Sequence, residues 1–173
     1  MEDTTSIIDE LIAEHRQINE SIGSCVRTTD DLCAAGRLED AKESFTPGRL
    51  EDLGQRAAQL EDALELIVSN IEQHFYREEK ILLGAFERHG LAKLASLLYA
   101  LLSEHGTIRT QLADMRSHAA KLTTVQTSRS VWEPNAWALR ARIAHVGREL
   151  QAHALREEAL FENAKKVLQG ESG

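Results

Sequence analysis

Two short segments of this chain share a residue pattern that could bind metal ions. Each segment carries a histidine, a glutamate four residues later and a second glutamate directly after it: His74, Glu78 and Glu79 in the first, and His153, Glu157 and Glu158 in the second. Residues four apart lie one above the other on one face of an α-helix, so each segment would present an imidazole and a carboxylate in one direction. Both groups are ordinary ligands of divalent transition metals.

Two further histidines occupy positions where an amphipathic helix would carry apolar side chains. His15 falls within the apolar positions that recur at intervals of three and four between residues 8 and 32, and His105 falls within those between residues 94 and 115. A single core histidine is more often a structural residue that bonds to the backbone. The coincidence of four such histidines with two glutamates favours a shared site instead.

The elements that must position these side chains are predicted to be four long helices. Apolar spacing places them at about residues 6–35, 49–87, 91–122 and 134–168, and the low proline and aromatic content agrees with an all-α chain. The stretch 123–130 is predicted to be a linker, Pro134 to lie in the first turn of the last helix, and Gly90 to end the second helix. Short connections favour an antiparallel up-down-up-down four-helix bundle, and we expect one domain over residues 1–173.

This topology brings the six candidate residues to one level of the bundle. His74 and His105 stand at similar distances from the turn between their helices, as His105 and His153 do from the next connection. An ionised carboxylate in an apolar core is unfavourable by several kcal/mol unless it is paired or coordinates a metal. The predicted core rows near Glu78 and Glu157 contain no lysine or arginine, so we expect a pair of divalent cations there. Ligand type alone leaves the metal open between iron, manganese and zinc.

The order of these residues resembles that of the hemerythrin-like, or HHE cation-binding, proteins, which carry a His, an H-x-x-x-E, a His and an H-x-x-x-E on successive helices. The resemblance covers almost the whole chain and implies two iron ions in an oxo- or hydroxo-bridged non-haem centre. It implies that one iron is bound by His15 and His153, the other by His74 and His105, and both by Glu78 and Glu157. Ferritin-like bundles fit less well, because they need Glu-x-x-His on two helices and no glutamate here stands three residues before a histidine.

The chain departs from the oxygen-carrying hemerythrins in two places. Those proteins have a further histidine one turn from the first on the third helix, where this chain has Leu101 and Arg109. They also have an aspartate five residues after the last histidine, where this chain has Glu158 beside Glu157, so either glutamate could be the ligand. With four histidines the chain is more similar to HHE proteins associated with nitric oxide and peroxide stress and with repair of iron centres.

The resemblance therefore implies a protein that binds or reacts with a small oxidant such as O₂, NO or peroxide. A carrier, a sensor and a peroxide- or NO-consuming enzyme all stay open, and iron storage or delivery is the alternative. The net charge of −8, with basic residues scattered among more numerous acids, argues against a nucleic-acid partner. No apolar stretch is long enough to span a membrane and the acidic start does not resemble a signal peptide, so we expect a cytoplasmic protein.

Several other side chains carry definite expectations. Without metal, Glu78 and Glu157 would face each other in an apolar layer, so their pKa values are predicted to rise. Glu79 and Glu158 are predicted to lie at the surface or to accept hydrogen bonds from ligating histidines. The remaining expectations concern surface groups and thiols: His118, His145, Tyr76 and Tyr99 should face solvent, and Cys25 and Cys33 should be reduced.

Overall fold

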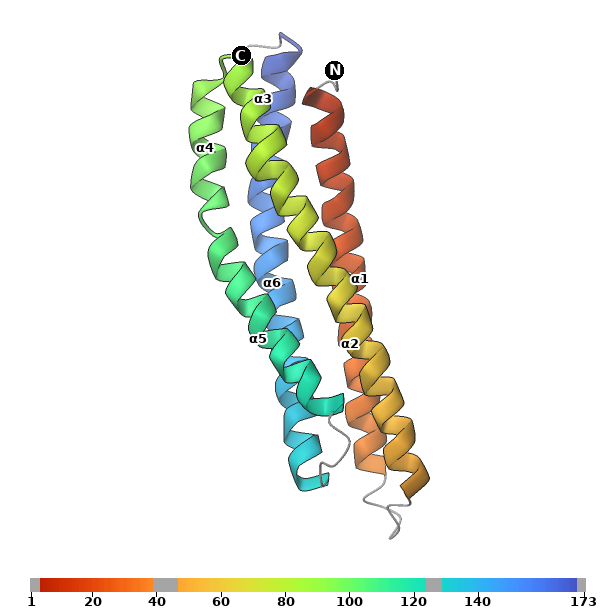
Figure 1. Ribbon diagram of the computed structural model, residues 1–173. Coiled ribbons are helices and arrows are strands. Elements are labelled where there is room, and N and C mark those ends of the chain that lie inside the picture. The colour runs from red at the N-terminus through yellow and green to blue at the C-terminus, as the bar shows by residue number, and fades with distance from the viewer. Residues whose placement is uncertain (1–3, 39–46, 124–128, 171–173) are drawn as a thin grey trace.

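The computed structural model describes residues 4–38, 47–123 and 129–170, and these form helices packed as a four-helix bundle (Figure 1). The helices are α1 (Thr4–Leu38), α2 (Pro47–Tyr76), the π-helix η2 (Arg77–Leu82), α3 (Leu83–Arg88), α4 (Ala92–Leu102), α5 (His105–Thr123) and α6 (Arg129–Leu168). Together, α2, η2 and α3 make the second column of the bundle, and α4 and α5 make the third. The all-α bundle predicted from the sequence is confirmed.

Neighbouring columns of the bundle run antiparallel (Figure 1). Helix α1 packs against α2 and α6, and α5 packs against the same two helices. The second and fourth columns, which carry the two His-x-x-x-Glu pairs, therefore stand diagonally opposite each other. The connection expected between the first two helices falls mostly on residues 39–46, and the linker expected at 123–130 falls mostly on 124–128; both segments lie outside the described residues.

A buried polar layer separates two apolar clusters along the bundle. On α1, Leu11 belongs to the smaller cluster, His15 to the polar layer and Ile18 to the larger cluster. On α6, Leu150 belongs to the larger cluster and Leu160 to the smaller one, with the polar layer between them. The helical repeat thus continues through the layer with polar instead of apolar residues, and packing on both sides fixes its height in the bundle.

The second column is not the single α-helix that the periodicity predicts over 49–87. Residues Arg77–Leu82 form a π-helix, in which the N–H of Leu83 donates to the carbonyl of Glu78. A π-helical turn spans one more residue than an α-helical turn, and such turns are often found at functional sites. This one contains Glu78 and Glu79. The column ends as expected, with α3 stopping at Arg88 and Gly90 at a φ of 69°.

The third column is also interrupted, although a continuous helix was predicted over 91–122. Helix α4 ends at Leu102, and α5 starts at His105. In the break the Ser103 hydroxyl donates to the carbonyl of Ala100 at 2.6 Å, and the Glu104 N–H donates to the carbonyl of Leu101 at 3.0 Å. Serine competes with regular helical bonding in this way, and the i to i+3 bond tightens the turn. The break falls directly before His105.

The last helix starts earlier than the sequence predicts. Helix α6 begins at Arg129, so Pro134 lies inside it and not in its first turn. Trp132 is buried in the larger cluster on one side of the proline, and Ala136 is buried on the other. This packing accounts for helical structure before a residue that cannot donate a backbone hydrogen bond.

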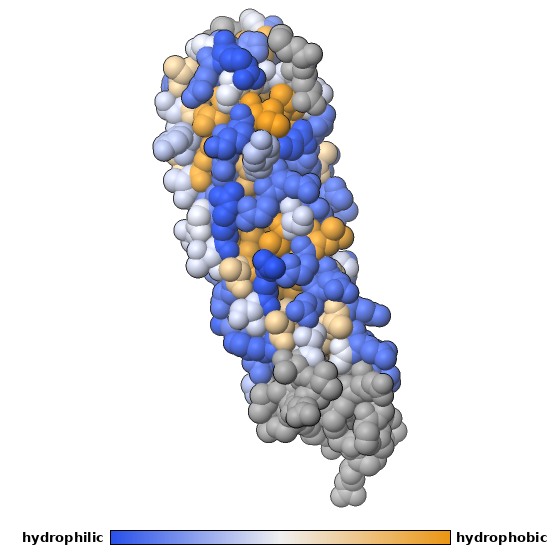
Figure 2. Space-filling view, viewed as in Figure 1, coloured by the Kyte–Doolittle hydropathy of each residue, from blue (hydrophilic) through white to orange (hydrophobic). Residues whose placement is uncertain are grey.

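The surface matches the charged composition. Figure 2 shows a mostly hydrophilic face with smaller apolar patches over the upper and middle parts of the bundle. Tyr76 and Tyr99 are exposed, as expected, and Cys25 and Cys33 are buried and not joined in a disulfide. Among the described residues, no helix is long and apolar enough to cross a membrane.

Candidate metal centre

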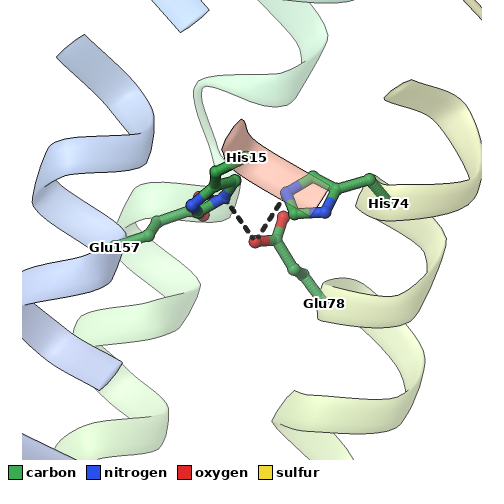
Figure 3. Close-up of side chains that lie close together, drawn as sticks. All are labelled: His15, His74, Glu78 and Glu157. Atoms are coloured by element: carbon green, nitrogen blue, oxygen red, sulfur yellow. Dashed lines mark ion pairs between the residues drawn. The ribbon is translucent and has the colours of Figure 1, made fainter. Parts of the chain in front are cut away.

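All six residues singled out by the sequence meet in the buried polar layer. They come from all four columns of the bundle, and none has more than 4% of its surface exposed: His15, His74, Glu78, His105, His153 and Glu157. Figure 3 shows four of them converging, with Glu78 between His15 and His74. The helical spacing from which the site was predicted therefore also brings these side chains into one layer.

The six residues form two adjacent clusters that share both glutamates. One cluster contains His15, His74, Glu78 and Glu157, and the other contains Glu78, His105, His153 and Glu157; in each, one ligand atom per residue lies within 4.8 Å of the others. The pairing of histidines expected from the resemblance is therefore wrong. His15 belongs with His74, whose ring centroid is 4.6 Å away, and His105 belongs with His153, at 5.0 Å. The pairs join helices α1 with α2 and α5 with α6.

Glu78 reaches both clusters, one with each carboxylate oxygen. Its Oε1 lies 3.1 Å from His74 Nε2 and 3.8 Å from His15 Nε2. Its Oε2 lies 3.4 Å from His105 Nε2, in the other cluster. A carboxylate placed in this way could bridge two cations.

Glu157 has the same arrangement from the opposite column. Its Oε2 lies 3.3 Å from His15 Nε2, while its Oε1 lies 3.0 Å from His153 Nε2 and 3.9 Å from His105 Nε2. The neighbouring Glu158 is about one third exposed and meets the outer side of His15 instead. Of the two glutamates left open by the sequence, Glu157 is the one that faces the clusters.

The inner atoms of the layer have too few partners for a buried site. Among the described side chains, His15 Nε2 and both carboxylate oxygens of Glu78 and of Glu157 are buried without a hydrogen-bond partner. Such groups are unfavourable unless something compensates them. Two cations between the imidazole nitrogens and the carboxylates would do so, and the donor set suits divalent transition metals. The residues therefore fit a binuclear metal site.

Electrostatics in the metal-free layer differ from the sequence expectation for Glu157. Burial alone would raise the pKa of Glu157, but the imidazoles of His105, His15 and His153 that face it outweigh burial and lower it. The predicted rise in pKa is thus wrong for this carboxylate. That prediction rested on the repulsion between the two carboxylates and left out the imidazoles around them.

In the metal-free layer, protons bind to His15 and His74 and not to Glu157. Burial would lower the pKa of His15, but Glu157 and Glu78 outweigh it and raise that pKa to about 10. Burial would likewise lower the pKa of His74, which Glu78 and Glu14 raise to about 9. In the absence of metal, a positive charge on the imidazoles of His15 and His74 thus stands where a cation would bind.

The outer nitrogen of every site histidine meets a further carboxylate. Two of these carboxylates were predicted from the sequence: Glu79 accepts a hydrogen bond from His105 Nδ1 at 2.8 Å, and Glu158 accepts one from His15 Nδ1 at 3.2 Å. The other two, Glu14 and Glu104, were not predicted, and they contact His74 and His153. A signal was present, because each of the missed glutamates directly precedes a site histidine in the sequence.

Apolar side chains close the layer. The ring of Phe75 is stacked on the imidazole of His105 with 3.7 Å between centroids. A narrow slot of about 10 Å³ lies against His15, His74 and His153, which is room for about one water-sized molecule. The other residues that line the slot are mostly apolar: Ile18, Asn19, Phe75, Leu150 and Ala154.

Comparison with known families gives one match, to the family described as hemerythrin HHE cation binding domain, over residues 7–164. The chain belongs to this family. Searches of curated proteins and of solved structures found no match. The hemerythrin match covers α1 to α6, and the two His/Glu clusters lie inside it. The chain is therefore a hemerythrin-like cation-binding protein, and its clusters favour a binuclear site.

In this hemerythrin-like chain, one of the two positions a helical turn from His105 holds an ion-pairing residue. Arg109 lies one turn after His105, where it donates to Glu72 at 2.9 Å and to Glu79 at 3.0 Å. Its guanidinium also lies 5.2 Å from the ring centroid of Phe75. Arg109 thus supports the carboxylate that holds His105.

Proposed function

We propose that this protein holds two iron ions in the buried layer and that the centre binds or reacts with a small oxidant: O₂, NO or peroxide. The observation that carries the proposal is the ligand count. Each cluster offers two imidazoles and one oxygen from each of two carboxylates. Four protein donors leave positions open on a metal that accepts more, and imidazole with carboxylate and open positions is typical of non-haem iron.

The slot beside the clusters supports a ligand of very few atoms. Its volume of about 10 Å³ and its apolar lining leave no room for an organic substrate. Leu150 and Phe75 form part of the apolar lining of the slot, while His15 and His153 reach it from the metal side. Iron, when bound, would supply the electrons for oxidant chemistry, and the protein would supply access, orientation and a dry environment.

Metal analysis joined to optical spectroscopy tests this proposal. Protein from iron-replete cells should hold two irons per chain, and anaerobic reduction followed by O₂, NO or peroxide should change its spectrum. A reversible change with O₂ would support a carrier, and repeated turnover that follows iron content would support an enzyme. Protein that retains no iron, or whose iron responds to none of the three oxidants, would refute the proposal.

A slot-filling substitution tests the access route separately. Leu150→Phe should slow the reaction with oxidant without reducing iron content, because Leu150 lines the slot and is not a ligand candidate. Leu155→Phe is the matched control on the same helix, since that side chain is 61% exposed. Equal oxidation rates for the two variants would contradict entry through this slot.

A further inference from the structure

The four outer carboxylates form a closed ring around the polar layer. In each case a carboxylate on one column accepts a hydrogen bond from the histidine Nδ1 of the next column. The contacts are Glu14 with His74 at 2.8 Å, Glu79 with His105 at 2.8 Å, Glu104 with His153 at 3.1 Å, and Glu158 with His15 at 3.2 Å. The ring therefore runs from the first column through the second and third to the fourth, and back to the first.

This ring suits histidines that bind metals through Nε2. Such an imidazole keeps its proton on Nδ1, and an acceptor there fixes both the tautomer and the ring orientation. All four Nε2 atoms point toward Glu78 or Glu157, and all four Nδ1 atoms point toward the ring carboxylates. Each column thus orients the candidate ligand of its neighbour.

Three of the four carboxylates are themselves held by an arginine. Arg109 donates to Glu79 at 3.0 Å, and Arg156 makes two bonds of 2.7 Å to the two oxygens of Glu104. Arg77 donates to Glu14. Within the described residues, no arginine or lysine pairs with Glu158, which also makes the longest of the four contacts to histidine.

The sequence has no arginine at the positions from which one could hold Glu158. Each of the three arginines follows the histidine of its own column by three or four residues: Arg77 after His74, Arg109 after His105, and Arg156 after His153. The corresponding positions after His15 hold Ile18 and Asn19. Ile18 is buried in the larger apolar cluster, and both side chains line the slot. The ring is therefore unsupported at the corner where the slot reaches the layer.

We propose that the four carboxylates are positioning residues and that Glu158, which contacts α1, is held less firmly than the three that an arginine supports. The metal position of His15 and His74 consequently exchanges its ion faster than that of His105 and His153. A carboxylate fixed by a guanidinium fork keeps its geometry, whereas a partly exposed carboxylate with one contact is free to turn toward water. Loss of such an outer partner typically weakens metal binding about 10- to 100-fold. The inference concerns metal binding and does not rest on the oxidant chemistry proposed above.

Release of Co²⁺ from the full chain to excess chelator tests this inference. Co²⁺ suits imidazole and carboxylate ligands whichever metal the protein holds in the cell, so the test is independent of the iron proposal. The wild type should release its two ions in two phases. Glu158→Gln should accelerate only the fast phase, by about tenfold, and Glu104→Gln should accelerate only the slow phase. These two residues are matched, because each is 34% exposed.

Two further variants sharpen the result. Asn19→Arg, which supplies the missing guanidinium, should slow the fast phase. Glu162→Gln should change neither phase, since Glu162 is 59% exposed and pairs with Lys165 away from the ring. A purely structural role would accelerate both phases together and lower the melting temperature. Single-phase release from the wild type would overturn the inference. It would also be overturned if Glu158→Gln and Glu104→Gln changed the same phase. If Asn19→Arg does not fold, Glu158→Gln and Glu104→Gln decide the inference.

Discussion

Metal removal is expected to make the stability of this protein fall as the pH rises above 6.5. In the metal-free layer the pKa of His15 is raised to about 10 and that of His74 to about 9, both from an ordinary value of 6.5. A group whose folded-state pKa is raised contributes stability that is fully present below its unfolded pKa and is lost as the pH climbs through the folded value. The expected window of loss therefore runs from pH 6.5 to about 9 or 10.

The size of this effect follows from the number of protons held. Each proton that the folded state binds and the unfolded state does not changes the unfolding free energy by about 1.4 kcal/mol per pH unit. We count one proton, because the rings of His15 and His74 are 4.6 Å apart and their positive charges repel. Between pH 6.5 and 9 the loss is then about 3 kcal/mol, or roughly 6–12 °C in melting temperature for a chain of this size.

Thermal unfolding of metal-free and metal-loaded protein across this range is the assay. Metal displaces the protons from the imidazoles, so the loaded form should lack the downward slope. The double variant His15→Gln/His74→Gln should flatten the metal-free slope, because neither imidazole is left to hold the proton. His145→Gln should leave the slope unchanged, because His145 is exposed and contacts Gln111 instead of the layer. A metal-free melting temperature that is constant or rises from pH 6.5 to 9 would refute the reasoning. So would equal slopes for the wild type and the double variant His15→Gln/His74→Gln.

Two other pairs of substitutions test the ligand assignment on α5 and the packing of α1 against α6. His105→Leu should lower metal content per folded chain clearly, whereas His118→Leu, beside Asp114 and off the polar layer, should keep it near wild type; metal analysis that shows equal content would contradict the assignment on α5. Gly147→Ala should destabilise the protein by about 1 kcal/mol, because its new methyl group would lie 2.8 Å from Ile22, while Gly54→Ala, with open space around it, should stabilise by up to about 1 kcal/mol. Denaturant unfolding measures both, and equal signs would refute the close α1–α6 contact.

The candidate residues could be found from the sequence because they follow the helical repeat of the core. His15 and His105 interrupt apolar stripes, and packing on both sides of the polar layer keeps those stripes facing inward. The pairing of the histidines could not be found in this way. It depends on the rotation of each helix about its axis, and a periodic pattern does not determine rotation to the few ångströms that separate two neighbouring metal positions.

The irregular segments escaped prediction for a local reason. The apolar spacing passes through Arg77–Leu82 without a visible change, yet the backbone there is a π-helix. The break before His105 contains one serine bond and one backbone bond from Glu104 to Leu101. Serine is common enough in helices that Ser103 alone predicts nothing. Both irregularities lie beside residues of the polar layer, which is where local rules most often yield to function.

The distances within the layer indicate that metal binding needs little rearrangement. Two atoms that would each bind one ion at about 2.0–2.2 Å must lie within about 4.4 Å of each other. The closest imidazole–carboxylate distances are already 3.1 Å for His74 with Glu78 and 3.0 Å for His153 with Glu157. The same spacing accommodates a hydrogen bond when a proton occupies Nε2. Protons and metal ions therefore compete for one prearranged set of atoms, and the outer carboxylates can hold the histidines in place in either state because they act on Nδ1.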